Sequence, residues 1–333
     1  MMSYVPGWMP VSGTRSILSP AYPLIFTMIW KRDFGLLARQ MVAWLIMGLI
    51  YVVLFSVIGW WLAGTGMFGT SYLYIIIGMA AVMALIQYFL SDKLVLMTTK
   101  SRIVSEDEEP KLYAMVKKLA DEADIPMPRV AVMPSPVPNA FATGRSPKHA
   151  VVAVTQAIRG ILTDAELEAV LAHELAHVKN RDMLTMTIGS FLVSVAAAIL
   201  NNAFIMAFLS SNRDSENGGG LIAFIVAMVV VVVVYIVGTL VTMAISRYRE
   251  FAADRGSAYI TRDPDALIRA LNKISGKMDT VPPDKKREVS GSNAFFIIPA
   301  ISGESIMELF STHPTLEKRV ANLEKIKQEM QGY

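Results

Sequence analysis

Four uncharged runs dominate the hydrophobic pattern along this 333-residue chain. They span approximately residues 41–64, 67–90, 183–209 and 221–246, and none of them contains Asp, Glu, Lys, Arg or His. A helix needs about 20 apolar residues to cross the hydrocarbon core of a bilayer. The fourth run is rich in Val, but it is too long for a buried strand. The pattern therefore predicts four transmembrane helices in two hairpins.

The composition strengthens this prediction and narrows the chemistry. Hydrophobic residues make up 53% of the chain and charged residues 18%, whereas soluble domains carry about 25% charged residues. A net charge of +3 is too small to indicate nucleic-acid binding, and we expect none. The chain has no cysteine and four histidines. Any metal ligands must therefore come from His, Asp and Glu.

Basic residues beside the runs predict the orientation in the membrane. Lys and Arg flank the outer ends of both hairpins, whereas the two loops within the hairpins carry a single arginine. By the positive-inside rule, both termini and the segments 91–182 and 247–333 are cytosolic. Residues 1–40 lack a signal-peptide pattern because prolines interrupt their short apolar run. We expect them to form a cytosolic or interfacial extension of a multi-pass protein in the cell membrane.

The two cytosolic segments carry a mixed pattern of helices and strands. A helix is predicted to open at Glu109-Pro110. The short runs RVAVMP and HAVVAVT are typical of strands. In 247–333 the pattern is helical, with a Pro/Gly-rich interruption at 276–304 and a closing helix from about Pro314.

One predicted helix carries the pattern His-Glu-x-x-His. Thr163 and Glu166 match a capping box at its start, and Ala, Leu and Glu follow. His173 and His177 are four residues apart, so they lie on one helix face with about 6 Å of axial rise between them. Two imidazoles at this spacing can share one zinc ion, and Glu174 can act as general base on a metal-bound water.

A catalytic zinc usually has three protein ligands and an open position. The best third ligand is Glu250, because the predicted hairpin between His177 and Glu250 returns both to the same cytosolic surface. Asp254 lies four residues after Glu250 on the same helix face and can orient a ligand histidine. Asp182 is a weaker alternative for the third ligand because its helical register relative to the two histidines is poor.

With these residues in place, the chain resembles the HtpX-type membrane zinc metallopeptidases, which are relatives of the CAAX prenyl endopeptidases. Four ordered motifs carry the resemblance: NAFATG at 139–144, HELAHVKNRD at 173–182, REFAAD at 249–254, and STHP at 311–314 with Arg319 beyond it. Together with the hydrophobic pattern they cover nearly the whole chain from about residue 35.

The resemblance implies a mostly α integral membrane protein with four transmembrane helices. Its cytosolic catalytic domain would be an α+β zincin of the gluzincin type, assembled from two segments. One Zn²⁺ per chain would be held by His173, His177 and Glu250. Glu174 would be the base, and Asp254 would support a ligand histidine.

Roles near the C-terminus also follow from the resemblance. His313 would stabilise the tetrahedral oxyanion or hold substrate; alternatively, Thr312 or His313 caps a helix with Pro314 in its first turn. Arg319 would contact substrate or pair with an acidic residue of the site.

The motif NAFATG suits an edge strand that pairs with an extended substrate. Asn139, Ala140 and Phe141 are the predicted substrate-binding residues, with main-chain groups of Asn139 or Ala140 offered to the substrate.

The predicted activity is zinc-dependent endoproteolysis of membrane proteins or peptides at the cytosolic face, as in membrane-protein quality control or a stress response. Partners beyond these substrates and the lipid bilayer are not indicated. Two alternatives stay open: a prenyl-protein endopeptidase of the CAAX type, and a non-proteolytic membrane scaffold with a structural zinc.

Overall fold

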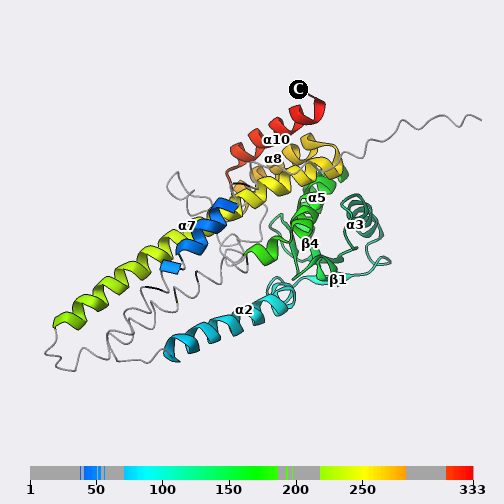
Figure 1. The fold of residues 1–333 in the computed structure, drawn as a ribbon. Coiled ribbons are helices and arrows are strands. Elements are labelled where there is room, and N and C mark those ends of the chain that lie inside the picture. Colours follow the sequence, from blue (N-terminus) through cyan, green and yellow to red (C-terminus); the bar gives the residue numbers. More distant parts are fainter. Residues whose placement is uncertain are drawn as a thin grey trace, which may run out of the picture. The chain divides into compact units, whose positions relative to one another are not determined.

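The computed structural model describes residues 41–50, 71–186, 218–282 and 313–332, together with a few isolated positions (Figure 1). They belong to one compact unit, Arg32–Tyr333. The predicted extension at 1–40, the second half of the first uncharged run and most of the third lie outside the described residues.

A four-stranded sheet forms the β part of the molecule. Its strands are β1 (Arg102–Val104), β2 (Arg129–Met133), β3 (Ala140–Thr143) and β4 (Val151–Thr155), in the order β1-β2-β4-β3. β2 pairs parallel with β4, and the two outer strands pair antiparallel with their neighbours. The predicted strands are confirmed, and β3 lies at an edge of the sheet.

The sheet is buried by helices, as the even spread of buried residues along β4 indicates. Val95 near the end of α2 (Ser71–Thr98) packs with Phe141 and with β2 and β4 side chains. α3 (Pro110–Glu122) begins at the predicted proline and packs against α5 (Asp164–Asn180), which also contacts β3 and β4. The short α4 (Gln156–Ile161) joins β4 to α5.

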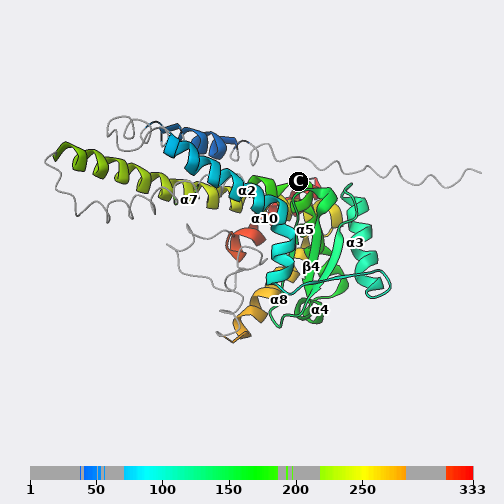
Figure 2. The same ribbon diagram turned by 90° about the horizontal axis from the view of Figure 1, so that it is seen from below.

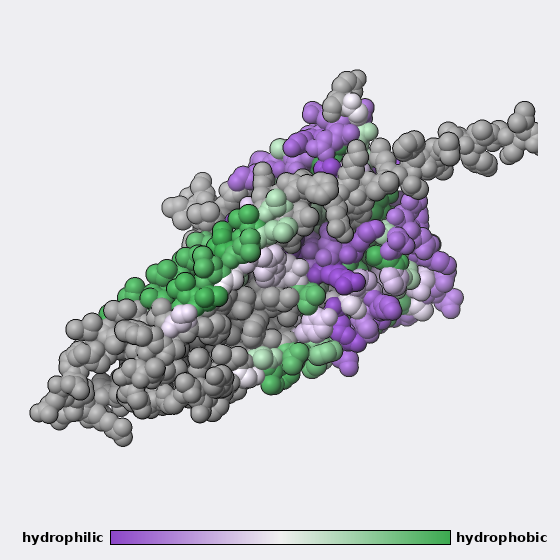
Figure 3. Space-filling view, in the orientation of Figure 1, coloured by the Kyte–Doolittle hydropathy of each residue, from purple (hydrophilic) through white to green (hydrophobic). Residues whose placement is uncertain are grey.

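The helix α7 (Gly218–Thr261) joins a hydrophobic stretch to the charged end that holds Glu250. Within the described residues, Met228–Thr261 is the helical stretch long and apolar enough to cross a membrane. Figure 3 shows hydrophobic side chains gathered over the apolar part of α7 and hydrophilic ones around α10. The helix does not break where the uncharged run ends at 246, so Glu250 lies on the same continuous helix as the apolar stretch.

Two further helices pack against α7. They are α8 (Pro264–Thr280) and α10 (Leu316–Gln331), and α8 also contacts α5 (Figure 2). The closing helix is capped by Thr315, whose hydroxyl accepts the amide of Lys318. The prediction of a Thr312 or His313 cap is therefore wrong, because helical backbone begins only after Thr315. The predicted interruption also begins later, since α8 continues through Gly276 to Thr280.

Candidate metal centre

The predicted capping box is present at the start of α5. The hydroxyl of Thr163 accepts the amide of Glu166 at 3.4 Å, and the Glu166 carboxylate accepts the amide of Thr163 at 2.8 Å. This start sets the helix register that brings His173 and His177 onto one face. Their Nε2 atoms are 3.2 Å apart.

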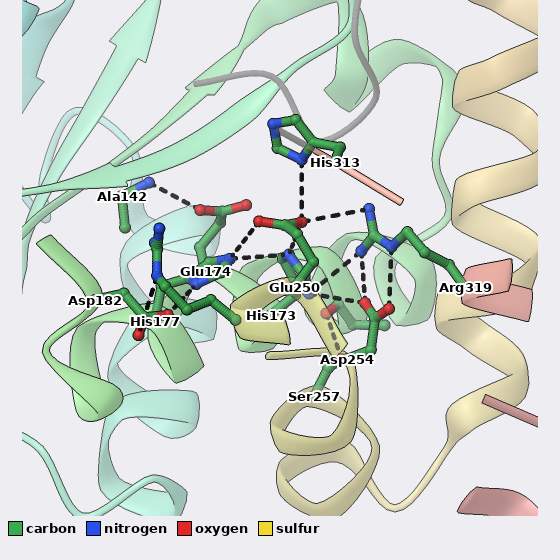
Figure 4. Close-up of polar contacts among 12 residues, drawn as sticks. Ala142, His173, Glu174, His177, Asp182, Glu250, Asp254, Ser257, His313 and Arg319 are labelled. Carbon is green, nitrogen blue, oxygen red and sulfur yellow. Dashed lines mark hydrogen bonds and ion pairs between the residues drawn. The ribbon is translucent and has the colours of Figure 1, made fainter. Parts of the chain in front are cut away.

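Glu250 reaches the two histidines from α7. Its Oε2 is 3.6 Å from Nε2 of His173, and its Oε1 is 3.4 Å from Nε2 of His177 (Figure 4). One ligand atom from each of the three residues lies within 4.8 Å of the others. Residues 73 positions apart in the chain, His177 and Glu250, thus form one cluster that can hold a metal ion.

Each histidine has a carboxylate on its other ring nitrogen. Asp254 Oδ1 is 3.0 Å from Nδ1 of His173, and Asp182 Oδ2 is 2.6 Å from Nδ1 of His177. In a neutral ring whose Nδ1–H donates to its carboxylate, the Nε2 lone pair faces Glu250, as a metal ligand requires. Asp182 therefore lies on the far side of His177 from the cluster, which excludes it as the third ligand in this geometry.

Arg319 reaches the cluster from α10. Its Nη2 and Nε donate to the two oxygens of Asp254 at 2.5 and 3.0 Å, and Nη2 lies 3.4 Å from Nδ1 of His173. Nη1 is 3.8 Å from Glu250 Oε2. The guanidinium is 2% exposed, so it contacts the site's carboxylates rather than solvent.

Glu174 lies beside the cluster of candidate ligands and is buried. Its Oε2 accepts a hydrogen bond from the amide of Ala142 in β3 at 2.9 Å. Burial raises the pKa of Glu174, and the neighbouring His173 and His177 only partly offset this effect. No sequence signal singled out Ala142, because its part depends on how β3 lies against α5.

His313 approaches Glu250 from the segment before α10. Its Nδ1 is 3.2 Å from Glu250 Oε2, and the residue is buried (Figure 4). The structure thus brings the His-Pro motif to the same cluster as the two histidines and Glu250.

Of the three residues predicted to bind substrate, Asn139 directly precedes β3 and Ala140 and Phe141 begin it, and their main-chain groups point alternately to the two sides of the strand. Asn139 pairs with Thr155, which donates its amide to the Asn139 carbonyl and accepts the Asn139 amide on its hydroxyl. Main-chain groups of successive residues in an antiparallel strand point to opposite sides. Those of Phe141 therefore also face β4, whereas those of Ala140 and Ala142 face the outer edge. Asn139 was predicted to present main-chain groups to the substrate, but those groups bond to Thr155 instead. The Phe141 side chain is part of the core.

The donor set fits a divalent cation. Four carboxylates, those of Glu174, Asp182, Glu250 and Asp254, surround the histidines, and two arginines, Arg249 and Arg319, contact them. With every carboxylate ionised, these four carboxylates and two arginines carry a net charge of −2.

Other features agree with this charge balance. Burial would lower the pKa of His173, but Asp254 and Glu250 raise it to about 9. The same negative surroundings favour a bound cation. Within the described part of the chain, the buried Oε2 of Glu250 makes no hydrogen bond of good geometry. Nδ1 of His313 and Nη1 of Arg319 lie near it at 3.2 and 3.8 Å as ion-pair contacts, which suits an oxygen aimed at a metal. Two imidazoles and one carboxylate form the ligand set of a catalytic metal site with an open position.

Comparison with known proteins agrees with this class of site. Residues 106–327 match Peptidase family M48. "Protease HtpX homolog 2" of Methanosarcina mazei is 51% identical over 301 residues, which cover 90% of this chain and 98% of that protein. "Protease HtpX homolog" of Moorella thermoacetica is 46% identical over 301 residues, covering 90% and 97%. The chain belongs to peptidase family M48 and is a membrane metalloprotease, which confirms the resemblance found in the four motifs.

A solved structure shows a similar fold. The crystal structure of S. mikatae Ste24p superposes with a TM-score of 0.53 over 87% of this chain and 67% of that chain. The two sequences are 19% identical, so the likeness concerns the fold alone.

Proposed function

We propose that this chain is a zinc endopeptidase that cleaves membrane proteins in their cytosolic loops or tails. The observation that carries the proposal is the convergence of His173, His177 and Glu250 beside the buried carboxylate of Glu174. One Zn²⁺ per chain would be held by the two Nε2 atoms and the Glu250 carboxylate. When bound, the metal supplies Lewis-acid chemistry: it lowers the pKa of a water and polarises a carbonyl.

In this proposal Glu174 is the general base. The amide of Ala142 holds its Oε2 at 2.9 Å, which leaves Oε1 to take a proton from the attacking water and pass it to the leaving nitrogen. Burial raises the pKa of Glu174 above that of an ordinary carboxyl group, which makes its carboxylate a stronger base toward the attacking water.

His313 and Arg319 would have different roles. His313 is buried beside Glu250, with its Nδ1 3.2 Å from Oε2, and it would donate to the oxyanion that develops on the substrate carbonyl. Arg319 is bonded to Asp254 at two atoms, so we assign it to positioning rather than to substrate contact. Asp254 would in turn fix the tautomer of His173.

The outer edge of β3 is proposed as the substrate-binding edge. Ala140 offers an amide and a carbonyl there, and Ala142 offers a carbonyl next to the amide that Glu174 uses. An extended peptide that adds to this edge would lie alongside the base.

The membrane arrangement completes the proposal. The four uncharged runs would form two hairpins, with both termini and the metal cluster on the cytosolic side. The apolar part of α7 followed directly by the charged end with Arg247, Arg249 and Glu250 supports this placement for the fourth run. Cleavage at the cytosolic membrane surface suits membrane-protein quality control.

The test is hydrolysis of a membrane-protein substrate by purified full-length protein, with and without a chelator. Glu174→Gln should keep bound zinc and lose at least 10²-fold of the rate, in line with the loss of a general base. Glu168→Gln, on the same helix and paired with Lys118 at the surface, is the matched control and should retain activity. Full activity of a zinc-loaded Glu174→Gln protein would overturn the mechanism.

Two alternatives remain distinguishable. A prenyl-protein endopeptidase would cleave a prenylated C-terminal peptide in preference to a membrane-protein loop, so the two substrates should be compared directly. A scaffold with a structural zinc needs a fourth protein ligand, whereas the cluster formed by the described residues has three.

A further inference from the structure

The second ligand histidine has a support of its own that the proposed mechanism does not use. Asp182 Oδ2 lies 2.6 Å from Nδ1 of His177 (Figure 4). Asp182 Oδ1 lies 3.2 Å from Nε of Arg249. The carboxylate is 4% exposed and the arginine 11% exposed. The pair Asp182–Arg249 therefore stands behind His177 as Asp254–Arg319 stands behind His173.

Regular helix geometry does not place Asp182 there. α5 ends at Asn180, and Arg181 adopts a left-handed backbone with φ 57° and ψ 39°. This conformation is unfavourable by about 1–2 kcal/mol for a residue with a side chain. Glycine is the usual residue at such a helix end, but here the position is occupied by Arg181. The turn brings the carboxylate back over the last turn of α5 to the ring of His177.

The two partners come from opposite ends of the segment that contains the third and fourth uncharged runs. Asp182 directly precedes the run at 183–209, and Arg249 follows the run at 221–246. Arg249 is also adjacent to the ligand Glu250. A single ion pair thus links the point where the chain leaves α5 with the point where α7 brings in the third ligand.

We propose that Asp182 and Arg249 are positioning residues for the metal site. Asp182 fixes the orientation of His177, and Arg249 fixes Asp182 relative to Glu250. Metal affinity then depends on the register between α5 and α7 where the two uncharged runs meet the catalytic domain. The inference rests on the proposed metal site and assigns these two residues no contact with substrate.

The test measures metal affinity by competition with a chelator, using full-length protein and zinc. Asp182→Asn keeps the size of the side chain but removes its charge, and it should weaken zinc binding 10- to 100-fold, as loss of a partner of a ligand histidine does. Arg249→Gln should weaken binding in the same direction. The double variant should lose less than the product of the two single losses, because both act through one contact. Lys325→Gln removes an exposed charge on α10, away from both pairs, and should leave affinity unchanged.

Three results would overturn the inference. Unchanged zinc affinity in Asp182→Asn and Arg249→Gln, with lower stability of the metal-free protein, would make the pair merely structural. Multiplicative losses in the double variant would mean that the two residues act separately. Loss of a ligand from the spectrum of cobalt-substituted Asp182→Asn would make Asp182 a ligand itself. Failure of the proposed function would look different: the unaltered protein would not bind zinc at all, or would bind it without hydrolysing substrate.

Discussion

The two ligand histidines have supports of the same chemistry and different surroundings. Behind His173, Asp254 and Arg319 are 0% and 2% exposed and make two hydrogen bonds with each other. Behind His177, one contact at 3.2 Å joins Asp182 and Arg249, and the histidine itself is 14% exposed. The inner pair, Asp254–Arg319, is built from α7 and α10. The outer pair, Asp182–Arg249, joins the end of α5 to α7.

This difference in burial separates stability from metal affinity. A charge left alone in the inner pair has no water to solvate it, so breaking that pair should destabilise the whole fold. The outer pair, Asp182–Arg249, is also mostly buried, but Arg249 is 11% exposed against 2% for Arg319, and one contact joins the pair instead of two. Its loss should therefore destabilise the fold less than loss of the inner pair. The outer pair should therefore matter chiefly for how His177 is presented to the metal.

The largest effect is expected from breaking the inner pair on one side only. Arg319→Met leaves Asp254 ionised and buried, and it should lower the free energy of unfolding of the metal-free protein by about 3–5 kcal/mol. Denaturant unfolding of purified protein measures this loss. Adding Asp254→Asn in the same chain should recover part of it, because no unpaired charge remains. Equal losses in the single and double variants would show that the pair is not coupled.

A smaller effect is expected from the outer pair, and only when metal is present. Zinc at 100 times its dissociation constant should stabilise the unaltered protein by about 2.7 kcal/mol. If Asp182→Asn weakens binding tenfold, the same zinc concentration stabilises that variant by about 1.4 kcal/mol. Thermal unfolding with and without zinc gives both values. A loss of the same size without zinc would remove the distinction between the two pairs.

The inner and outer pairs both depend on the packing of α5 against α7. Ser257 Oγ donates to the carbonyl of Ala169 at 2.6 Å, and both residues are buried. Ser257→Ala should cost about 1 kcal/mol of unfolding free energy. Zinc affinity should stay close to that of the unaltered protein, because neither pair loses a member. A marked loss of affinity, measured by chelator competition, would mean that the helix contact itself sets the metal geometry.

The predictable parts of the site are those that depend on helix spacing. His173 and His177 follow from the four-residue repeat of one helix, and Asp254 follows Glu250 by the same rule. Asp182 was harder to assign because its place depends on the left-handed turn at Arg181, for which no glycine gives a signal. Arg319 depends on tertiary packing, because nothing in the sequence of α10 indicates that the fold buries this charged side chain together with Leu323 and Ile326.

The fold was predictable to a similar extent. Local patterns identified β2, β4 and β3 and the start of α3, because alternation and proline act over a few residues. The strand β1 was missed because its three residues carry no repeat, and pairing with β2 alone defines it. Sequence also could not show that α7 continues unbroken past residue 246 to Thr261, which is what fixes Glu250 to the apolar stretch before it.

The smallest effect is expected at the start of α5, far along the helix from both pairs. Thr163→Ala removes a cap whose hydrogen bond is long, at 3.4 Å, so the loss should be at the low end for a cap, about 0.5 kcal/mol. Glu166 remains held by Lys273 at 2.7 Å, which limits fraying to the first turn. Because His173 lies more than two turns further along, zinc affinity and hydrolysis should not change. If chelator competition showed weaker zinc binding in Thr163→Ala, the metal site would depend on the whole of α5, and the distinct roles of the inner and outer pairs would have to be abandoned.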